Sequence, residues 1–319
     1  MTLLLAINSA GDSWALEKWR ERFRAVLPNH TIVMEGVDTY APASIRYAGV
    51  WKPRPGLLAG LPKLAAIFNL GAGVDALLTD PTLPTHVPLT RIVNTDLTKR
   101  MTEYVVLHVL LHHRRMPMLL EAQRDKQWRA KDQWAASAVR VGIMGLGELG
   151  RDAAEVLLRL GFRVAGWSRT PRQVPDVPTF AGDAGLSAFL GQTDILVALV
   201  PLTPDTRGIL NRSLFAKLAR DGVLGAPVLI NAGRGGLQVE TDILAALDDG
   251  TLGGATLDVF ETEPLPATSR LWTHPRVIVT PHNAADSDPD AIARDVAEQV
   301  KAIEAGAPLR NVVDRTLGY

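Results

Sequence analysis

The sequence contains no cysteine among its 319 residues. Disulfide bridges, a thiolate nucleophile and cysteine-ligated metal are therefore excluded. It also has no surplus of charge of either sign, because 34 Lys and Arg balance 34 Asp and Glu. This balance disfavours a nucleic-acid binder that works through bulk positive charge, and it disfavours a chain disordered by self-repulsion.

Long apolar runs are missing as well. The longest candidate near the N-terminus, residues 2–7, has no Lys or Arg before it and stops at Asn8. It is too short to span a bilayer, which needs about 20 apolar residues, and it lacks the charge of a secretory signal. We expect a buried first strand there, no membrane partner and a cytoplasmic location.

The sequence does contain a regular alternation of short apolar runs and helical patterns. The first series of candidate strands comprises residues 3–8, 31–35, 45–51, 64–69 and 91–94, and the second comprises residues 139–144, 162–167, 194–200, 228–231, 255–259 and 277–280. Strands of this kind, separated by helices, predict parallel sheets covered on both faces. We therefore predict two α/β domains, with helices at residues 14–27, 102–116 and 290–305 among the connections.

The sharpest local motif is Gly-x-Gly-x-x-Gly at Gly145, Gly147 and Gly150, which follows a candidate strand and opens an apolar helix. Gly145 permits a tight turn, Gly147 lets the backbone approach a pyrophosphate, and Gly150 lets helix and strand pack closely. The helix N-terminus adds free N–H groups and a positive dipole. A purely structural glycine turn is the alternative, but the complete strand–loop–helix–strand context favours a dinucleotide site.

The end of the strand that follows indicates which dinucleotide is bound. NAD-specific sites carry an acidic residue there for the ribose 2′-hydroxyl. This chain instead has Ser168, Arg169, Thr170 and Arg172, with no acid before Asp176. An arginine can pair with a 2′-phosphate and stack on adenine. An ordinary polar turn is the alternative, but we predict NADPH and NADP⁺, with NADH and NAD⁺ bound more weakly.

Three later clusters, in this order after the glycine motif, resemble the D-isomer-specific 2-hydroxyacid dehydrogenase family. They are residues 231–236 (NAGRGG), 257–266 (LDVFETEPLP) and 280–285 (TPHNAA). The closest resemblance is to the glyoxylate/hydroxypyruvate reductase A branch, which residues 69–75 (NLGAGVD), 167–170 (WSRT) and the ending Gly318-Tyr319 also resemble.

The resemblance implies an architecture and an assembly. It implies a Rossmann-type NAD(P)-binding domain at residues 99–285 and a flavodoxin-like substrate domain at residues 1–98 plus 286–319. The active site is then expected in the cleft between them. The resemblance also implies a homodimer through the coenzyme domains, with the helix at residues 102–116 in the interface.

Reduction of a 2-oxo acid requires a proton donor and a cation for the carboxylate. His282 suits the first role because imidazole titrates near neutral pH, and Arg234 suits the second because guanidinium offers a planar fork of donors. The resemblance assigns Glu263 as the partner of His282, and it assigns Asp258 to the nicotinamide carboxamide or to poising the site. Considered one at a time, each of these residues could equally be a solvated loop or turn residue. Their joint occurrence at predicted strand ends favours catalysis.

The resemblance further implies contacts to cofactor and substrate. The cofactor contacts are Gly145, Leu146, Gly147, Glu148, Leu149, Ser168, Arg169, Thr170, Arg172, Val200, Pro201, Ala232, Gly233, Arg234, Asp258, His282 and Ala284. The substrate contacts are Trp51, Leu70, Gly71, Ala72, Gly73, Arg234 and His282. For Trp51, a place in the hydrophobic core is an equally open interpretation.

His108 and His112 lie four residues apart on a predicted helix, as metal ligands can. No Glu follows His108 and no third ligand is evident nearby, so we predict a structural or interface helix and no metal.

The predicted function is NADPH-dependent reduction of small 2-oxo acids, namely glyoxylate to glycolate and hydroxypyruvate to glycerate, without a nucleic-acid partner. Another D-2-hydroxyacid dehydrogenase is an alternative. Formate dehydrogenases pair their histidine with Gln where Glu263 stands here, and many phosphoglycerate dehydrogenases carry a regulatory domain for which we expect no room. A dinucleotide-sensing binding protein of the same fold is the non-enzymatic alternative.

Overall fold

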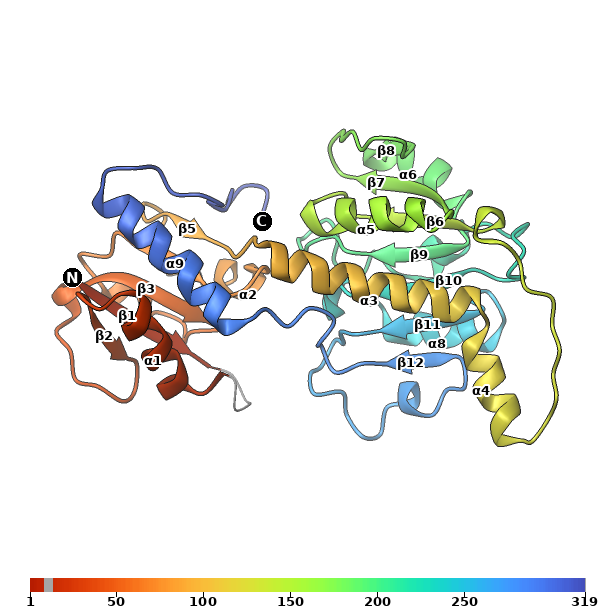
Figure 1. Cartoon of the computed structure of the whole chain (residues 1–319), viewed down its shortest axis with the longest axis horizontal. Helices are drawn as coiled ribbons and strands as arrows, with labels where there is room; N and C mark the ends of the chain where they lie inside the picture. The colour runs from red at the N-terminus through yellow and green to blue at the C-terminus, as the bar shows by residue number, and fades with distance from the viewer. Residues whose placement is uncertain (9–13, 319) are drawn as a thin grey trace. The chain divides into compact units, whose positions relative to one another are not determined.

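The computed structural model describes residues 1–8 and 14–318. Tyr319, part of the ending that carries the resemblance, lies outside the described residues. The chain divides into two units, Met1–Leu97 with Ser287–Tyr319 and Thr98–Asp286. Each unit is built around its own parallel sheet (Figure 1). The protein therefore has the two-domain α/β fold class that the sequence predicts.

The first unit holds a five-stranded sheet of order β2-β1-β3-β4-β5, all parallel. This is the flavodoxin-like strand order of doubly wound folds. Its strands are β1 (Thr2–Ile7), β2 (Thr31–Met34), β3 (Ile45–Trp51), β4 (Ala66–Asn69) and β5 (Leu89–Thr90).

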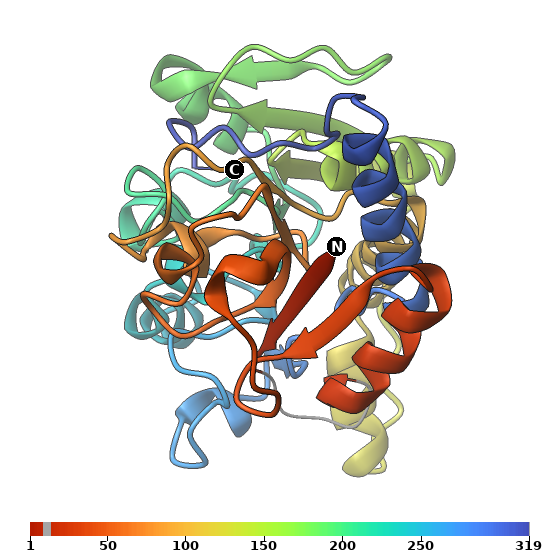
Figure 2. The same ribbon diagram turned by 90° about the vertical axis from the view of Figure 1, so that its left-hand side faces the viewer.

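Both faces of this sheet are covered. Because side chains alternate along a strand, Leu3 and Leu5 of β1 face one hydrophobic cluster, while Leu4 and Ala6 face another. Helices α1 (Leu16–Val26) and α9 (Pro289–Glu304) pack together on the first face, as Figure 2 shows. The short helix α2 (Asp75–Leu78) and the 3₁₀ turn at Leu58–Gly60 contribute to the second. The C-terminal helix thus completes the N-terminal unit.

The second unit holds a seven-stranded parallel sheet of order β12-β11-β10-β9-β6-β7-β8. Counted from β6, this order reads 7-6-5-4-1-2-3, the order of a Rossmann dinucleotide-binding sheet with one further strand. Its strands are β6 (Arg140–Met144), β7 (Arg163–Ser168), β8 (Thr179–Ala181), β9 (Ile195–Ala198), β10 (Val228–Asn231), β11 (Gly254–Leu257) and β12 (Val277–Val279).

Helices cover both faces of the second sheet as well. One face packs on α3 (Thr95–His113) and α5 (Glu148–Arg159), through residues such as Val105 and Leu157. The other face packs on α6 (Gly182–Leu190), α7 (Arg212–Phe215) and α8 (Glu240–Asp248). A further helix, α4 (Met116–Arg124), follows α3. Within the described part of the chain, no helix is both long and apolar enough to cross a membrane.

Three sequence predictions of elements are wrong in detail. The last strand of the first sheet is β5 at Leu89–Thr90, and residues 91–94 form no regular structure. Instead, the Asn94 side chain accepts the N–H of Leu97 at 2.8 Å and caps the first turn of α3, which begins seven residues before the predicted start. The predicted helix also ends early, because Arg115 adopts a left-handed φ of 57° between α3 and α4. Strand β8 was not predicted.

Candidate active site

The predicted site residues of the second unit follow six strands of its sheet. Gly145 follows β6, Arg169 follows β7, Val200 follows β9, Ala232 follows β10, and Asp258 follows β11. His282 lies three residues beyond β12. Because all these strands are parallel, their carboxyl ends meet at one edge of the sheet, which is where open α/β sheets bind ligands.

The glycine motif has the geometry that a dinucleotide requires. Gly145 has a φ of 114°, and a Cβ there would lie 2.8–2.9 Å from backbone atoms of Leu199 and Val200 in the loop after β9. A Cβ on Gly150 would lie 1.9 Å from the carbonyl oxygen of Gly145, so only glycine lets α5 pack this close to β6. The chain therefore turns sharply at the point where the strand order reverses.

Space for a phosphate is left at the N-terminus of α5. Apart from Gly147 and its two chain neighbours, no heavy atom of the described residues lies within 4 Å of the position of a Cβ on Gly147, the N-cap of α5. No described side chain caps this helix. Its first N–H groups and its dipole thus point to an open position beside a glycine backbone, which fits a pyrophosphate.

The end of β7 carries the predicted 2′-phosphate residues. Ser168 is its last residue, and Arg169 and Thr170 follow directly. The Nη1 atom of Arg169 lies 3.5 Å from Oδ2 of Asp205, an exposed carboxylate in the loop after β9. Sequence reasoning missed Asp205, because the two residues are 36 positions apart.

His282 and Glu263 form a close pair. Nδ1 of His282 lies 2.7 Å from Oε2 of Glu263, and the other carboxylate oxygen accepts the N–H of Phe260 at 3.1 Å. The carboxylate is thereby fixed from the backbone. Since Nδ1 faces the carboxylate, Nε2 is the ring nitrogen that can give a proton to a substrate oxygen.

Asp258 holds the backbone around His282. His282 has a left-handed φ of 54°, a conformation that costs free energy for a residue with a Cβ. Its N–H donates to the carbonyl of Asp258 at 2.8 Å. The Asp258 carboxylate, which is buried, accepts the N–H groups of Asn283 at 3.0 Å and Ala284 at 3.1 Å. This arrangement favours a poising role for Asp258 over a direct bond to the cofactor.

The loop that carries Arg234 is fixed by a buried amide pair. Asn231 donates to the carbonyl of Arg234 at 3.1 Å and to the side-chain oxygen of Gln238 at 2.8 Å. Gln238 in turn donates to the carbonyl of Val259 at 2.9 Å, which ties this loop to the one after β11. A Cβ on Gly235 would lie 1.8 Å from the Phe260 carbonyl oxygen, so the two loops are in direct contact. Arg234 and Glu263 are thus presented by connected loops.

The predicted substrate residues of the first unit form a compact loop of their own. Asn69 donates its side-chain N–H groups to the carbonyls of Gly71 at 2.8 Å and Gly73 at 2.9 Å. A Cβ on Gly71 would lie 2.2 Å from the ring of Trp51, which is partly exposed at the end of β3. Trp51 therefore packs on this loop and is not a fully buried core residue.

Several predicted contacts have buried side chains. Leu70, Leu146 and Val200 are at most 4% exposed, so their side chains are not available to a ligand. Within each unit the structure brings its own predicted residues together. Trp51 and residues 70–73 belong to the first unit, whereas the catalytic and cofactor residues belong to the second.

The two helical histidines have structural partners. Nε2 of His112 lies 2.9 Å from the Thr256 hydroxyl, and Nδ1 of His108 lies 3.4 Å from the same hydroxyl. Burial lowers the pKa of each to about 4. The part of the chain that the structure describes holds no group of three His, Cys, Asp or Glu side chains suited to a metal ion.

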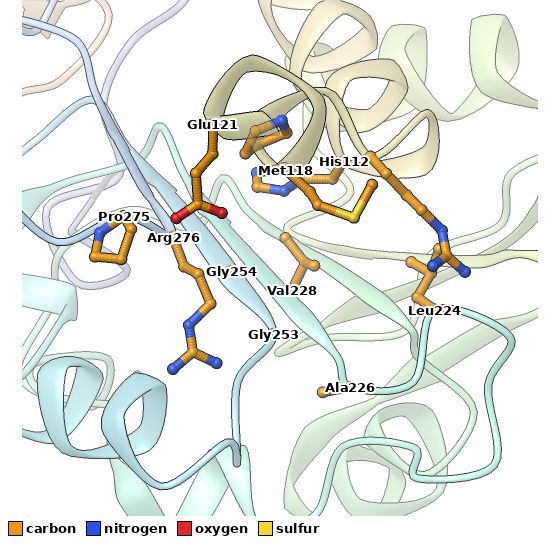
Figure 3. A pocket seen from close by; sticks show the side chains of 12 residues that line it. His112, Met118, Glu121, Leu224, Ala226, Val228, Gly253, Gly254, Pro275 and Arg276 are labelled. Atoms are coloured by element: carbon orange, nitrogen blue, oxygen red, sulfur yellow. The ribbon is translucent and has the colours of Figure 1, made fainter. Parts of the chain in front are cut away.

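A cavity of about 400 Å³ lies elsewhere in the second unit (Figure 3). It is lined by His112 and Met118 from the α3–α4 region and by Val228 and Gly254, which begin β10 and β11. It therefore lies at the amino ends of the strands, and it contains none of the predicted cofactor or substrate residues.

The comparisons with known proteins all lead to one family. Residues 106–284 match the family model described as D-isomer specific 2-hydroxyacid dehydrogenase, NAD binding domain. The chain is 44% identical to a glyoxylate/hydroxypyruvate reductase A from Serratia proteamaculans over 278 residues, covering 86% of this chain and 87% of the relative.

Solved structures resemble the chain over its full length. An NADPH-dependent glyoxylate/hydroxypyruvate reductase from Sinorhizobium meliloti, in complex with NADP and sulfate, is 47% identical with a TM-score of 0.92, covering 100% of this chain and 99% of that one. A D-isomer specific 2-hydroxyacid dehydrogenase from Xanthobacter autotrophicus, in complex with NADPH and MES, is 40% identical with a TM-score of 0.91 and 99% coverage of both chains.

Proposed function

The chain belongs to the D-isomer-specific 2-hydroxyacid dehydrogenase family, and on this premise we propose that it reduces glyoxylate, hydroxypyruvate and similar small 2-oxo acids with NADPH. The observation that carries the proposal is the 2.7 Å pair of His282 and Glu263 at the edge of a dinucleotide-binding sheet. Relatives named glyoxylate/hydroxypyruvate reductase support the substrate class, and relatives solved with NADP or NADPH support the cofactor.

The residues of the second unit divide the chemistry between them. NADPH, when bound, supplies the hydride that reduces the carbonyl carbon. His282 gives a proton from Nε2 to the oxygen that becomes the alcohol, and Glu263 stabilises the imidazolium that precedes this step. Arg234 binds the substrate carboxylate and polarises the carbonyl. The products are the 2-hydroxy acid and NADP⁺.

The cofactor is assigned to the edge formed by the glycine motif and the end of β7. Gly147 and the N-terminus of α5 take the pyrophosphate, and Arg169, with Ser168, Thr170 and Arg172, takes the 2′-phosphate. The remaining contacts are assigned to the loops after β9, β10 and β12, at Val200, Pro201, Ala232, Gly233 and Ala284. The resemblance and the open position beside Gly147 support this assignment.

A substrate domain of residues 1–98 plus 286–319, within one residue of the bounds of the first unit, is assigned to the substrate, and residues 99–285 to the coenzyme. Backbone N–H groups of residues 71–73 are assigned to the substrate carboxylate, and Trp51 to the substrate side chain. The N–H of Leu70 donates to the carbonyl of Val50 at 2.9 Å and is therefore not among them. The bonds from Asn69 support this role, because they fix the loop through its carbonyls.

A homodimer through the coenzyme unit is part of the proposal, as is a cytoplasmic location without a nucleic-acid partner. Leu107 on α3, Leu120 on α4 and Trp128 beyond it are 53%, 49% and 98% exposed. Exposed apolar side chains along this one segment of the chain support a protein interface that includes it. Sedimentation of the purified protein tests the dimer: a monomer at micromolar concentration contradicts it.

The function itself is tested by the loss of NADPH absorbance with a panel of 2-oxo acids, including glyoxylate, hydroxypyruvate, pyruvate and longer homologues. We expect turnover of the small acids, with NADPH preferred over NADH. Cofactor binding without turnover of any acid would instead favour a dinucleotide sensor.

A further inference from the structure

A polar chain leads from helix α3 to the backbone around His282. The hydroxyl of Tyr104 on α3 lies 2.8 Å from Oγ1 of Thr280, which directly follows β12. Oγ1 of Thr280 donates to Oδ1 of Asp258 at 2.6 Å. The same carboxylate accepts the N–H groups of Asn283 and Ala284.

The direction of each bond in this chain is fixed by its acceptor. A carboxylate only accepts hydrogen bonds, so Thr280 donates its one hydroxyl proton to Asp258. Tyr104 must then donate to Thr280. Burial raises the pKa of Tyr104 well above its usual range, by more than the bond to Thr280 lowers it, so the proton stays on the tyrosine at neutral pH. The hydrogen bonds therefore all point in one direction, from Tyr104 through Thr280 to Asp258. Successive hydrogen bonds of this kind polarise and strengthen one another.

Tyr104 is itself held in place. It is only 9% exposed, and its ring centroid lies 4.2 Å from that of His108, one turn further along α3. His108 approaches the Thr256 hydroxyl on β11. The hydroxyl of Tyr104 is therefore a fixed donor whose position is set by the packing of α3 on the sheet.

We propose that Tyr104 is a positioning residue for the proton donor: through Thr280 it orients the Asp258 carboxylate, which fixes the left-handed backbone at His282. The inference rests on the proposed function, in which His282 gives the proton. Without the Tyr104 hydroxyl, Thr280 keeps its bond to Asp258 but loses the donor that sets its own rotation. The Asp258 carboxylate then holds the amides of Asn283 and Ala284 less tightly, and the imidazole samples unproductive positions.

Tyr104→Phe is the first variant, because it removes the hydroxyl and keeps the ring on His108. We expect kcat to fall about three- to tenfold, the range that one neutral hydrogen bond supports. The Kd for NADPH should stay within about twofold of wild type, since this tyrosine acts on the proton donor. Tyr47→Phe is the matched control: it removes a buried tyrosine hydroxyl in the first unit, bonded to Met1 and Glu304, and should leave kcat unchanged.

Variants of Thr280 test whether Tyr104 acts through this residue. Thr280→Val removes the hydroxyl at nearly constant volume and should lower kcat at least as much as Tyr104→Phe. Thr280→Ser keeps the hydroxyl and should retain most of the activity. If the two residues act in one chain, the double variant of Tyr104→Phe and Thr280→Val should be no worse than Thr280→Val alone. Full additivity of the two losses would overturn the proposal.

Hydrogen–deuterium exchange of the amides of residues 282–285 gives a readout that does not depend on turnover. Tyr104→Phe should speed exchange there, and Tyr47→Phe should not. Unchanged exchange together with unchanged kcat would overturn the proposal and leave Tyr104 as a satisfied core hydroxyl. If the wild type reduces no 2-oxo acid while exchange still responds to Tyr104→Phe, the proposed function fails and the anchoring of the His282 backbone stands.

Discussion

Nδ1 of His282 lies 2.7 Å from Oε2 of Glu263, and the N–H of Phe260 binds the other oxygen of that carboxylate at 3.1 Å. The imidazole is therefore oriented by a carboxylate that is itself held by the main chain. Such an arrangement fixes the ring orientation and leaves Nε2 as the nitrogen that can act on a substrate.

His282→Ala should lower kcat by about 10²–10⁴-fold, the usual contribution of a general acid. NADPH binding, followed by fluorescence titration, should change little, because the proton donor acts on the substrate. His86→Ala, at an exposed histidine of the first unit, is the control and should behave as wild type. Activity within about threefold of wild type would show that another group supplies the proton.

Glu263→Gln should lower kcat for reduction by about tenfold or more, because it removes the charge-assisted bond that holds the His282 ring at 2.7 Å. The Kd for NADPH should change little, because the carboxylate acts on the imidazole and not on the cofactor. Steady-state kinetics and a fluorescence titration measure the two quantities. Wild-type kcat in the variant would contradict the coupling of these two residues.

Arg169→Ala should raise KM for NADPH at least about tenfold and leave KM for NADH nearly unchanged, because only NADPH carries the 2′-phosphate. Arg163→Ala is the matched control, because it removes an exposed arginine at the opposite end of β7. It should leave KM for both cofactors unchanged. Asp205 lies 3.5 Å from Arg169 and competes for it, so Asp205→Asn should lower KM for NADPH. Equal effects of Arg169→Ala on both cofactors would remove the arginine from the 2′-phosphate site.

Gly147→Ala separates cofactor binding from stability. A Cβ at this position meets no described atom within 4 Å, and the backbone φ is −75°, so the unliganded protein should keep its Tm. The methyl group would occupy the approach of the pyrophosphate, and we expect the Kd for NADPH to rise at least about tenfold. Gly60→Ala, equally open in the first unit, is the control. Unchanged NADPH affinity would argue against pyrophosphate at the N-terminus of α5.

Acid should destabilise the second unit through His108 and His112. Burial lowers the pKa of each from 6.5 to about 4. Between pH 6.5 and pH 4 these histidines are protonated in the unfolded chain but neutral in the folded chain. The stability that the protein has above pH 6.5 is therefore lost progressively down to pH 4. Each histidine should lower the free energy of unfolding by about 2 kcal/mol at pH 5 relative to pH 7.5.

Urea unfolding of wild type and His112→Gln at the two pH values measures this effect. The variant has no titrating ring, so its stability should fall less on acidification. An equal fall in both proteins would mean that other groups govern acid unfolding.

The sequence alone determined the fold class and displayed the glycine motif, because these signals are local. Strands β3 and β10 have the predicted bounds, because each is a short and mostly apolar run that suits a covered sheet. The turn at Gly145 and the contact of Gly150 with the Gly145 carbonyl both lie within six residues, so the glycine spacing is visible in the chain. His282 and Glu263 were paired through the resemblance, and their contact follows from strand ends that any parallel sheet brings to one edge.

Tertiary structure decided what depends on packing between distant segments. One local signal was misinterpreted: Asn94 was predicted to end a strand, but its side chain caps α3 by accepting the N–H three residues further on. Asp205 reaches Arg169 only through the folding of the loop after β9. Tyr104 and Thr280 are 176 positions apart, and their hydroxyls meet because α3 packs across the sheet beside β11 and β12. A hydrogen bond depends on distances of a few tenths of an ångström, and for residues so far apart only the assembled core sets such distances.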